Sequence, residues 1–395
     1  MKNCSESALG SKTSSRGVED ESAKPVGGSV GYAGFVGLDV HKETIAVAIA
    51  LPDRSAPRFD GEIANTPKAV EKLFKQLAGD GEIYLWCYEA GPCGYGLYRQ
   101  LRELGHDCEV VAPPESSKLK TDRRDALKLA RLLRSGDLRC VWVPGKEQEA
   151  MRDLSRCRAD FKIQEKKAKL QLNAFVLRHR HHWPRGKSRW TKSHFAWLED
   201  LKFAHPWQQE VLQEYIDAVQ SASSRVAAVT KSLMNAIPEW SLAPVVDSLI
   251  ALRGVDRITA VTLLAELGDI SRFDSPKQLM GFLGLVPNLR QSGSSRRSGS
   301  ITLAGNSHAR RALVESAWCY RFPARKTKHL QRKEANASDA AKAIAWRAQQ
   351  RLCGRYRALM QAGKNSKVTC IAIARELVGF VWDIVRHEIP KATPA

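Results

Sequence analysis

The sequence lacks three features that would have placed the protein in other classes. No run approaches the roughly 18 consecutive apolar residues of a transmembrane helix, and residues 1–33 contain no apolar stretch like that of a signal peptide. The nine Cys residues form no C-x-x-C pair, and their odd number argues against a disulfide framework. These absences predict a cytoplasmic protein in a reducing compartment, with no membrane partner.

Acidic residues are scarce relative to basic ones. The 395 residues include 62 Lys or Arg and 42 Asp or Glu, which gives a net charge of +20 at pH 7. Half of this excess lies in residues 152–192, with 13 basic and 3 acidic residues, and another +5 lies in residues 290–311. Because 43% of the residues are hydrophobic, the chain can bury a core and is not a disordered basic tail. The composition predicts a folded protein whose partner is a polyanion.

After a tail of residues 1–33, the chain has the pattern of an α/β domain, which we place at residues 34–145. Apolar or alternating segments predict strands, and segments with apolar residues every three to four positions predict helices. In chain order, they are strands at 35–42, 44–51 and 58–65, a helix at 69–77, a strand at 83–88, a helix at 95–104, a strand at 109–112 and a helix at 122–133. Three strands followed by alternating helices and strands is the order of a ribonuclease H-like (RuvC-like) domain.

The remaining sequence is mostly helical. Long helical segments at 147–177 and 207–237 predict a basic linker or assembly region at residues 146–240, followed by a mostly α C-terminal domain at residues 241–395. Residues 249–264 resemble a helix-hairpin-helix, in which turn amides and a helix N-terminus meet a DNA phosphate. Asp256 stands where such hairpins commonly have a second Gly and would repel a phosphate. An αα-hairpin used only for packing is therefore an equal alternative.

Four carboxylate side chains form the first group of residues that indicates a catalytic site. Asp39 lies within an apolar strand, where a charge is costly unless it is paired or binds a metal, and Glu89 ends another buried strand. Asp122 and Asp125 share one face at the start of a helix, where they could also simply complement the helix dipole. Clustered carboxylates predict Mg²⁺ or Mn²⁺, and two such ions about 4 Å apart can hold the attacking and leaving oxygens of a phosphodiester. Actin-like ATPases and sugar kinases also have a mid-strand Asp, but the glycine-rich phosphate loops that they need are missing.

A second constellation lies at residues 286–306, which are rich in Ser, Gly and Arg and contain no acid. Composition alone predicts a flexible basic loop that contacts phosphates. A catalytic interpretation assigns the nucleophile to Ser292 and bidentate phosphate binding to Arg290, Arg296 and Arg297. Residue chemistry does not reject the competing hydroxyls, which belong to Ser294, Ser295, Ser298 and Ser300.

Three motifs, GLDVHK, YEAGPCGYGLYRQL and KTDRRDALKLARLL, resemble those of the DEDD-type insertion-sequence transposases. These enzymes are related to Holliday-junction resolvases and are understood as bridge-RNA-guided recombinases. The resemblance covers almost the whole chain after the tail. It places the DEDD tetrad on Asp39, Glu89, Asp122 and Asp125.

The segment GFLGLVPNLRQSGSSRRSGSITLAGNSHARRAL is similar to the C-terminal serine transposase domain of the same family. Anchoring on Pro287, on residues 299–302 and on residues 305–306 places the family's nucleophilic serine on Ser292. Here Arg290-Gln291 replaces a usual Tyr-Ser, and Ser294 replaces a Gly. Ser294 is therefore the alternative nucleophile.

The resemblance implies an RNA-guided enzyme that cleaves and exchanges DNA strands with a Mg²⁺-dependent (or Mn²⁺-dependent) DEDD site and a serine. It also implies a homo-oligomer, either a dimer or a tetramer, in the cytoplasm of a prokaryote, associated with the nucleoid when it acts. We predict contacts to nucleic acid from Arg290, Arg296, Arg297, Arg310, Arg311, Lys166, Lys167 and Lys169. The alternatives are a metal-dependent, structure-specific nuclease that uses water as its nucleophile and a nucleic-acid-binding regulator without activity.

Overall fold

The computed structural model describes residues 31–77, 81–113, 121–292 and 295–389. It consists of two compact units, Met1–Val143 and Pro144–Ala395. Most of the predicted 1–33 tail, the tip of the serine-rich segment at residues 293–294, and the C-terminal residues 390–395 lie outside the described residues. None of the described helices is long and apolar enough to cross a membrane.

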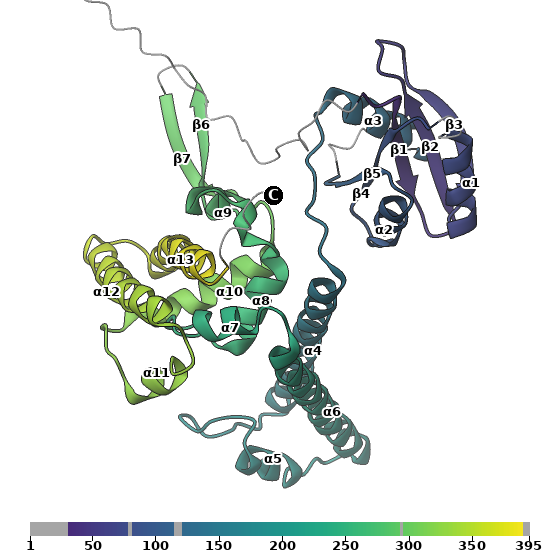
Figure 1. Cartoon of the computed structure of the whole chain (residues 1–395). Coiled ribbons are helices and arrows are strands. Elements are labelled where there is room, and N and C mark those ends of the chain that lie inside the picture. Colours follow the sequence, from purple (N-terminus) through teal and green to yellow (C-terminus); the bar gives the residue numbers. More distant parts are fainter. Residues whose placement is uncertain (1–30, 78–80, 114–120, 293–294, 390–395) are drawn as a thin grey trace, which may run out of the picture. The chain divides into compact units, whose positions relative to one another are not determined.

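The first unit is a five-stranded mixed sheet with helices (Figure 1). Its elements are β1 (Gly34–Val40), β2 (Thr44–Ala50), β3 (Arg58–Ala64), α1 (Pro67–Leu77), β4 (Tyr84–Glu89), α2 (Gly96–Glu103), β5 (Asp107–Val111) and α3 (Asp122–Ser135). The strand order is β3-β2-β1-β4-β5, with antiparallel pairing among the first three strands and parallel pairing from β1 to β4 and β5. The predicted order of strands and helices is confirmed, and the sheet is consistent with a RuvC-like domain.

Alternation along β2 shows why this sheet has two different faces. Ile45, Val47 and Ile49 pack into a core with Val70 and Leu73 of α1. The Ala residues between them, at positions 46, 48 and 50, pack against Ala residues of α3. Because side chains alternate along a strand, large residues fill one face while small residues let α3 lie close to the other.

The second unit is mostly helical, with one β-hairpin (Figure 1). Its elements are α4 (Lys146–Arg178), α5 (Lys192–Glu199), α6 (Pro206–Ala236), η1 (Ile237–Glu239), α7 (Ala243–Leu249), α8 (Arg257–Leu267), η2 (Ile270–Arg272), α9 (Pro276–Phe282), β6 (Pro287–Ser292), β7 (Ser295–Ile301), α10 (Ser307–Ala317), η3 (Trp318–Arg321), α11 (Lys328–Lys333), α12 (Asp339–Gln361) and α13 (Ser366–Glu388). The long helices α4 and α6 pack along each other.

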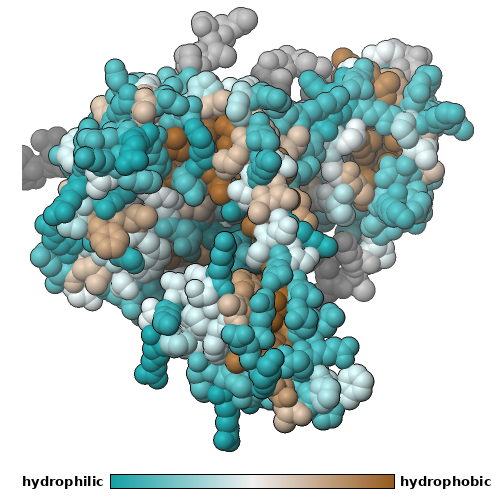
Figure 2. Space-filling model, turned by 90° about the horizontal axis from the view of Figure 1, so that it is seen from below, coloured by the Kyte–Doolittle hydropathy of each residue, from teal (hydrophilic) through white to brown (hydrophobic). Residues whose placement is uncertain are grey.

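Two apolar cores hold this unit together. One joins α4, α5 and α6 through residues such as Leu172, Leu198 and Leu212. A larger one joins α7, α8, α9, α10, α12 and α13 and includes Met151 of α4 and Leu233 of α6. Hydrophilic residues cover most of the face shown in Figure 2. The division of this unit at residues 240 and 241 stays a prediction.

Candidate active site

Close packing of α3 on β1 positions the carboxylates. Gly37 and Asp39 are two residues apart on β1 and so lie on the same face of the sheet. A Cβ atom on Gly37 would lie 2.4 Å from the backbone nitrogen of Ala130 and 2.5 Å from the backbone oxygen of Ala126. The missing side chain therefore lets the α3 backbone approach the strand that carries Asp39.

The start of α3 is fixed by its cap. Thr121 has an extended conformation, and its hydroxyl accepts a hydrogen bond from the backbone N–H of Arg124. Gly136 ends the helix in the left-handed conformation, with φ of +74°. Asp122 and Asp125 both lie in the first turn, where the helix dipole favours negative charge.

Asp39, His41 and Asp122 meet at this point. The Nε2 atom of His41 lies 3.4 Å from Oδ2 of Asp39 and 3.3 Å from Oδ1 of Asp122. One ligand atom from each of the three side chains lies within 4.8 Å of the other two. Asp39 is 9% exposed, whereas the other two side chains are open to solvent. The cluster is thus accessible on one side and anchored in the sheet on the other.

The electrostatics of Asp39 show that the cluster is short of positive charge. Burial raises the pKa of its carboxyl group above the ordinary value, and the negative charges of Asp122 and Asp125 raise it further. His41 acts in the opposite direction but does not cancel these effects. A bound cation would favour the ionised form of Asp39 and reduce the repulsion between the carboxylates.

Glu89 ends the strand next to β1. Tyr88 pairs with Leu38 in the parallel ladder, so Glu89 and Asp39 are the next residues on neighbouring strands. Glu89 is half-buried and is not a member of the three-residue cluster. The structure therefore brings Asp39 and Asp122 together with Asp125 close enough to act on Asp39, and it places Glu89 at the adjoining strand end.

The donor set fits a divalent cation. Carboxylate oxygens suit Mg²⁺ and Mn²⁺, and an imidazole nitrogen is a common ligand for transition metals. Sequence reasoning missed His41, although it belongs to the GLDVHK motif. Its signal was its place just after the strand that carries Asp39, two residues along the chain. The residues that could hold a metal are Asp39, His41 and Asp122.

The serine-rich segment is a β-hairpin, and the prediction of a flexible loop is wrong for its described residues. Strands β6 and β7 pair with Pro287 opposite Ile301, Arg290 opposite Arg297 and Ser292 opposite Ser295. Ser292 is exposed at the tip of the hairpin. The alternative nucleophile, Ser294, lies outside the described residues. The segment has few of the β-branched and aromatic residues that usually indicate strands, so composition concealed the hairpin.

The predicted nucleic-acid-binding residues fall into two groups. Lys166, Lys167, Arg297 and Arg311 are exposed. Arg310 instead donates from Nη1 to the backbone oxygens of Leu283 and Ala304. The ammonium group of Lys169 donates to Glu165 and lies 5.2 Å from the centre of the Trp190 ring. The side chains of Arg290 and Arg296 are outside the described residues.

The turn between α7 and α8 has a packing role. Gly254 has φ of +84°, and a Cβ atom there would lie 2.4 Å from the backbone oxygen of Ser316 on α10. The Asp256 carboxylate accepts from the backbone N–H of Thr259 and so caps α8 itself. Because this carboxylate occupies the helix N-terminus that a phosphate would need, the geometry favours the packing alternative over a DNA-binding helix-hairpin-helix.

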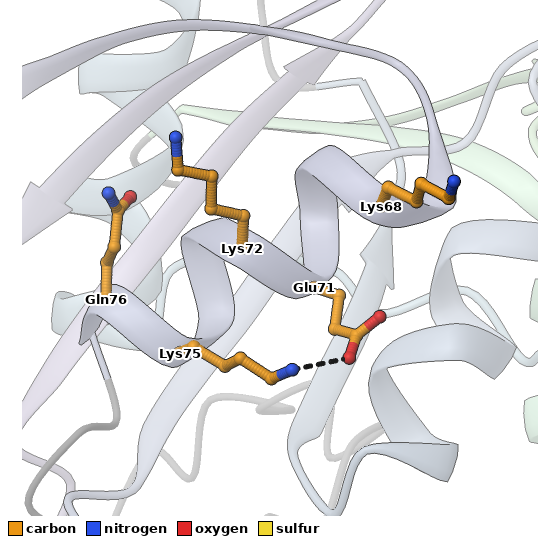
Figure 3. Close-up of a pocket in the computed structure, with 5 residues that line it drawn as sticks. All are labelled: Lys68, Glu71, Lys72, Lys75 and Gln76. Carbon is orange, nitrogen blue, oxygen red and sulfur yellow. Dashed lines mark ion pairs between the residues drawn. The ribbon is translucent and has the colours of Figure 1, made fainter.

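A shallow hollow on α1 is not a candidate site. It is lined by Lys68, Glu71, Lys72, Lys75 and Gln76, all from one helix (Figure 3). The ammonium group of Lys75 lies 2.8 Å from the Glu71 carboxylate, a pair with ordinary spacing for a helix surface.

Comparison with known proteins finds two regions of the chain that match transposase family models. A model of DEDD transposases matches residues 36–180, and a model of the transposase IS116/IS110/IS902 family matches residues 247–331. A putative transposase of Sinorhizobium fredii, y4qE, is 46% identical over 359 residues, which cover 89% of this chain and 88% of that protein. The transposase for insertion sequence element IS1533 of Leptospira borgpetersenii is 31% identical, covering 84% and 98%. The pilin gene-inverting protein of Moraxella lacunata is 24% identical, covering 69% and 68%. This chain belongs to the IS110 family of DEDD-type insertion-sequence transposases.

Proposed function

We propose that the protein cleaves and exchanges DNA strands with a Mg²⁺-dependent or Mn²⁺-dependent carboxylate site and with Ser292 as its nucleophile. The observation that carries this proposal is the cluster of Asp39, His41 and Asp122, with Glu89 and Asp125 beside it. The exposed hydroxyl of Ser292, on a hairpin that also carries Arg297, supports the serine step.

Each residue has a distinct part in the proposed site. A bound divalent cation would supply positive charge for a phosphodiester that the carboxylates alone would repel. Asp39 anchors the site because its strand is buried, and Asp122 completes it from the first turn of α3. Without a cation, the Nε2 atom of His41 lies between the two carboxylates, and the same atom would ligate a bound cation. Glu89 and Asp125 bring further negative charge that favours a cation over water alone.

In the proposed reaction, the Ser292 oxygen attacks phosphorus. A bond forms between Oγ and phosphorus, the bond between phosphorus and the 3′ oxygen breaks, and the hydroxyl proton of the serine is lost to solvent. The released 3′ oxygen takes up a proton and becomes a hydroxyl. Attack by the 3′ hydroxyl of another strand reverses these steps, so rejoining needs no external energy source.

We also propose a structured guide RNA and self-association as part of this function. The exposed basic residues Lys166 and Lys167 on α4 offer contacts to phosphates. These contacts carry no base information, which suits an enzyme whose sequence choice comes from an RNA. Such a protein would act in the cytoplasm of a prokaryote, at the nucleoid.

The experiment is a strand-exchange assay on DNA with the ends of the insertion sequence and the RNA transcribed from them. We expect Asp39→Asn and Ser292→Ala each to abolish exchange while nucleic-acid binding, measured by mobility shift, stays near that of the original chain. Asp60→Asn on β3 and Ser298→Ala on β7 are matched controls that should exchange normally. Full exchange by Ser292→Ala would contradict the proposed nucleophile. Metal-dependent cleavage by that variant, without exchange, would favour a nuclease that uses water.

A further inference from the structure

A buried carboxylate near the C-terminal end of α8 has no part in the proposed chemistry. Glu266 is 4% exposed and is the second-to-last residue of the helix. Negative charge is disfavoured at a helix C-terminus, and an unpaired buried charge is costly. Specific contacts must therefore offset the cost of Glu266.

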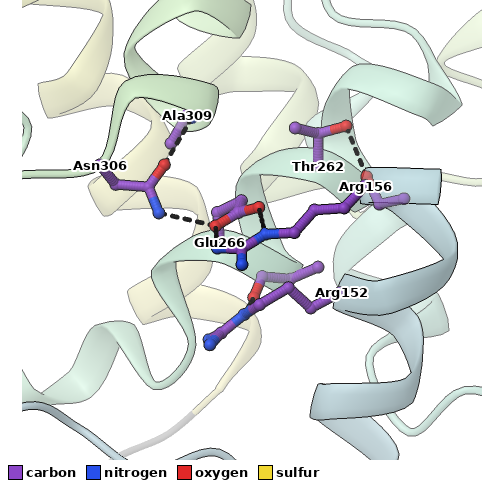
Figure 4. A network of polar contacts seen from close by, with 8 residues as sticks. Arg152, Arg156, Thr262, Glu266, Asn306 and Ala309 are labelled. Atoms are coloured by element: carbon purple, nitrogen blue, oxygen red, sulfur yellow. Dashed lines mark hydrogen bonds and ion pairs between the residues drawn. The ribbon is translucent and has the colours of Figure 1, made fainter. Parts of the chain in front are cut away.

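Those contacts come from two sides (Figure 4). Arg156 of α4 donates from Nε to Oε1 at 2.7 Å and from Nη2 to Oε2 at 2.8 Å. Asn306 donates from Nδ2 to Oε2 at 2.6 Å. Burial alone would raise the pKa of Glu266, but these hydrogen bonds lower it below the ordinary value. The carboxylate is ionised and ties α4 to Asn306, five residues after the end of the serine hairpin and directly before α10.

Asn306 is a fixed point at the base of the hairpin. Its Oδ1 atom accepts from the backbone N–H of Ala309 and caps α10, while its amide group is held by Glu266. The preceding Gly305 has φ of +69°, and a Cβ atom there would lie 1.9 Å from the backbone oxygen of Phe282. The chain that leaves β7 is thus locked against the end of α9 before it reaches α10.

The α4 side of this contact is rigid as well. Gln148 donates to the backbone oxygen of Leu264, and Arg152 donates to that of Ala265. The hydroxyl groups of Ser155 and Thr262 lie 3.1 Å apart. A row of polar contacts therefore joins α4 to α8 along the same face that presents Arg156 to Glu266.

The hairpin itself lacks the means to fix its own direction. The residues of β6 and β7 with described side chains are exposed from Asn288 to Ser300, and a two-stranded ribbon without an apolar face is only marginally stable alone. The orientation of the hairpin must therefore be set by the residues that connect it to the rest of the helical unit.

We propose that Glu266 is a positioning residue that orients the serine hairpin through Asn306 and couples this orientation to α4 through Arg156. This inference rests on the proposed role of Ser292. In this role, Glu266 contacts neither DNA nor metal. Glu266 determines where the hydroxyl group at the hairpin tip points. Misplacement of a reacting group by about 1 Å can cost about 100-fold in rate, so loss of this link should be visible in the chemical step.

The test exchanges the carboxylate at position 266 and the amide at position 306. Asn306→Asp places two carboxylates in contact, and Glu266→Gln turns an amide N–H toward Arg156 or Asn306, both of which are donors. We expect each single variant to form the covalent protein–DNA adduct of the serine about 100-fold more slowly than the original chain. The double variant restores a contact between an amide and a carboxylate, and Asp remains a good cap for α10. Arg156 keeps only the Gln oxygen as its acceptor at position 266, so the double variant should recover part of the rate that the single variants lose.

The controls separate positioning from stability. Asp247→Asn removes the carboxylate that pairs with Arg257 at the other end of α8 and should keep the full rate. Asn306→Ser keeps a capping hydroxyl but loses the amide that bonds Glu266, so it should lose more rate than its loss of folded protein explains. This variant also serves if Asn306→Asp does not fold.

Three results would overturn the inference. They are a full rate for Asn306→Ser, a rate loss in the single variants that matches their loss of folded protein, and a double variant that regains stability without regaining rate. If the original chain forms no serine adduct, the proposed function itself is contradicted. An adduct that forms equally well in all variants contradicts only the role of Glu266.

Discussion

At the scale of single residues, Asp39 is placed where function and stability conflict. Its folded-state pKa is raised, so the folded chain holds the proton more tightly than the unfolded chain. Stability is therefore lost as the pH rises from the ordinary Asp value through the raised value, and at pH 7 the ionised carboxylate destabilises the metal-free fold.

The destabilising effect of the Asp39 charge predicts the outcome of Asp39→Asn. The variant removes the charge but keeps the shape, so the melting temperature of the metal-free protein at pH 7 should rise, while stabilisation by added Mn²⁺ disappears. Differential scanning calorimetry with and without metal measures both effects. A lower melting temperature in the metal-free variant would contradict the account of Asp39.

The sequence predicted some of these residues better than others. Asp39 stood out because a charge inside an apolar strand needs a reason, and Asp122 because it shares one face with Asp125 at the start of a helix. His41 was missed because it lies in the turn after β1, where no periodicity marks it. The distance of Glu89 from the cluster depends on the twist of the sheet and on side-chain direction, which spacing along the chain does not encode.

At the scale of elements, the contact between β1 and α3 determines the geometry of the site. Gly37→Ala adds a methyl group within 2.4 Å of a backbone nitrogen, which cannot move without shifting α3. We expect a loss of about 1–3 kcal/mol or more in the free energy of unfolding, together with weaker Mn²⁺ binding, because Asp122 moves with α3.

Gly96→Ala is the matched control for this change. Gly96 begins α2, and a Cβ atom there meets nothing within 4 Å. Urea unfolding should show that Gly96→Ala is neutral or stabilising. Equal stability of Gly37→Ala and Gly96→Ala would contradict the close-packing argument.

A second element-scale feature is a row of exposed apolar residues on α4. Ile163, Leu170 and Leu177 are 56%, 57% and 60% exposed and lie seven positions apart, which is the repeat of a coiled-coil seam. The row is one apolar residue in seven and shares its helix face with Lys166 and Lys167, so the homo-oligomer stays a prediction for which this row is one candidate contact. The sequence predicted the long helices α4 and α6 because their apolar residues recur at regular helical spacing. The hairpin of β6 and β7 has no such pattern.

The row predicts the effect of Leu170→Glu. A charge in the middle of a seam should shift the protein toward monomers in light scattering after gel filtration, with the helical signal in circular dichroism unchanged. Gln171→Glu adds the same charge one position away, on an exposed residue outside the row, and should leave the assembly intact. An unchanged mass for Leu170→Glu would show that the row is not the interface.

At the scale of the whole molecule, charge and chemistry are distributed between the two units. The carboxylates lie in the α/β unit, whereas the two most basic segments, residues 152–192 and 290–311, lie in the helical unit. The net charge of +20 predicted a polyanionic partner. The reaction was predicted from four acidic residues, because only a few groups in defined places can supply the chemistry.

The central claim is that a serine of the hairpin becomes joined to DNA. The most direct measurement traps the reaction on a DNA substrate, digests the protein and identifies the modified peptide by mass spectrometry. We predict a nucleotide on Ser292, formed only with Mg²⁺ or Mn²⁺ and absent from Asp39→Asn. Modification of Ser294 instead would move the nucleophile by two residues, and cleaved DNA without any protein adduct would contradict the serine mechanism.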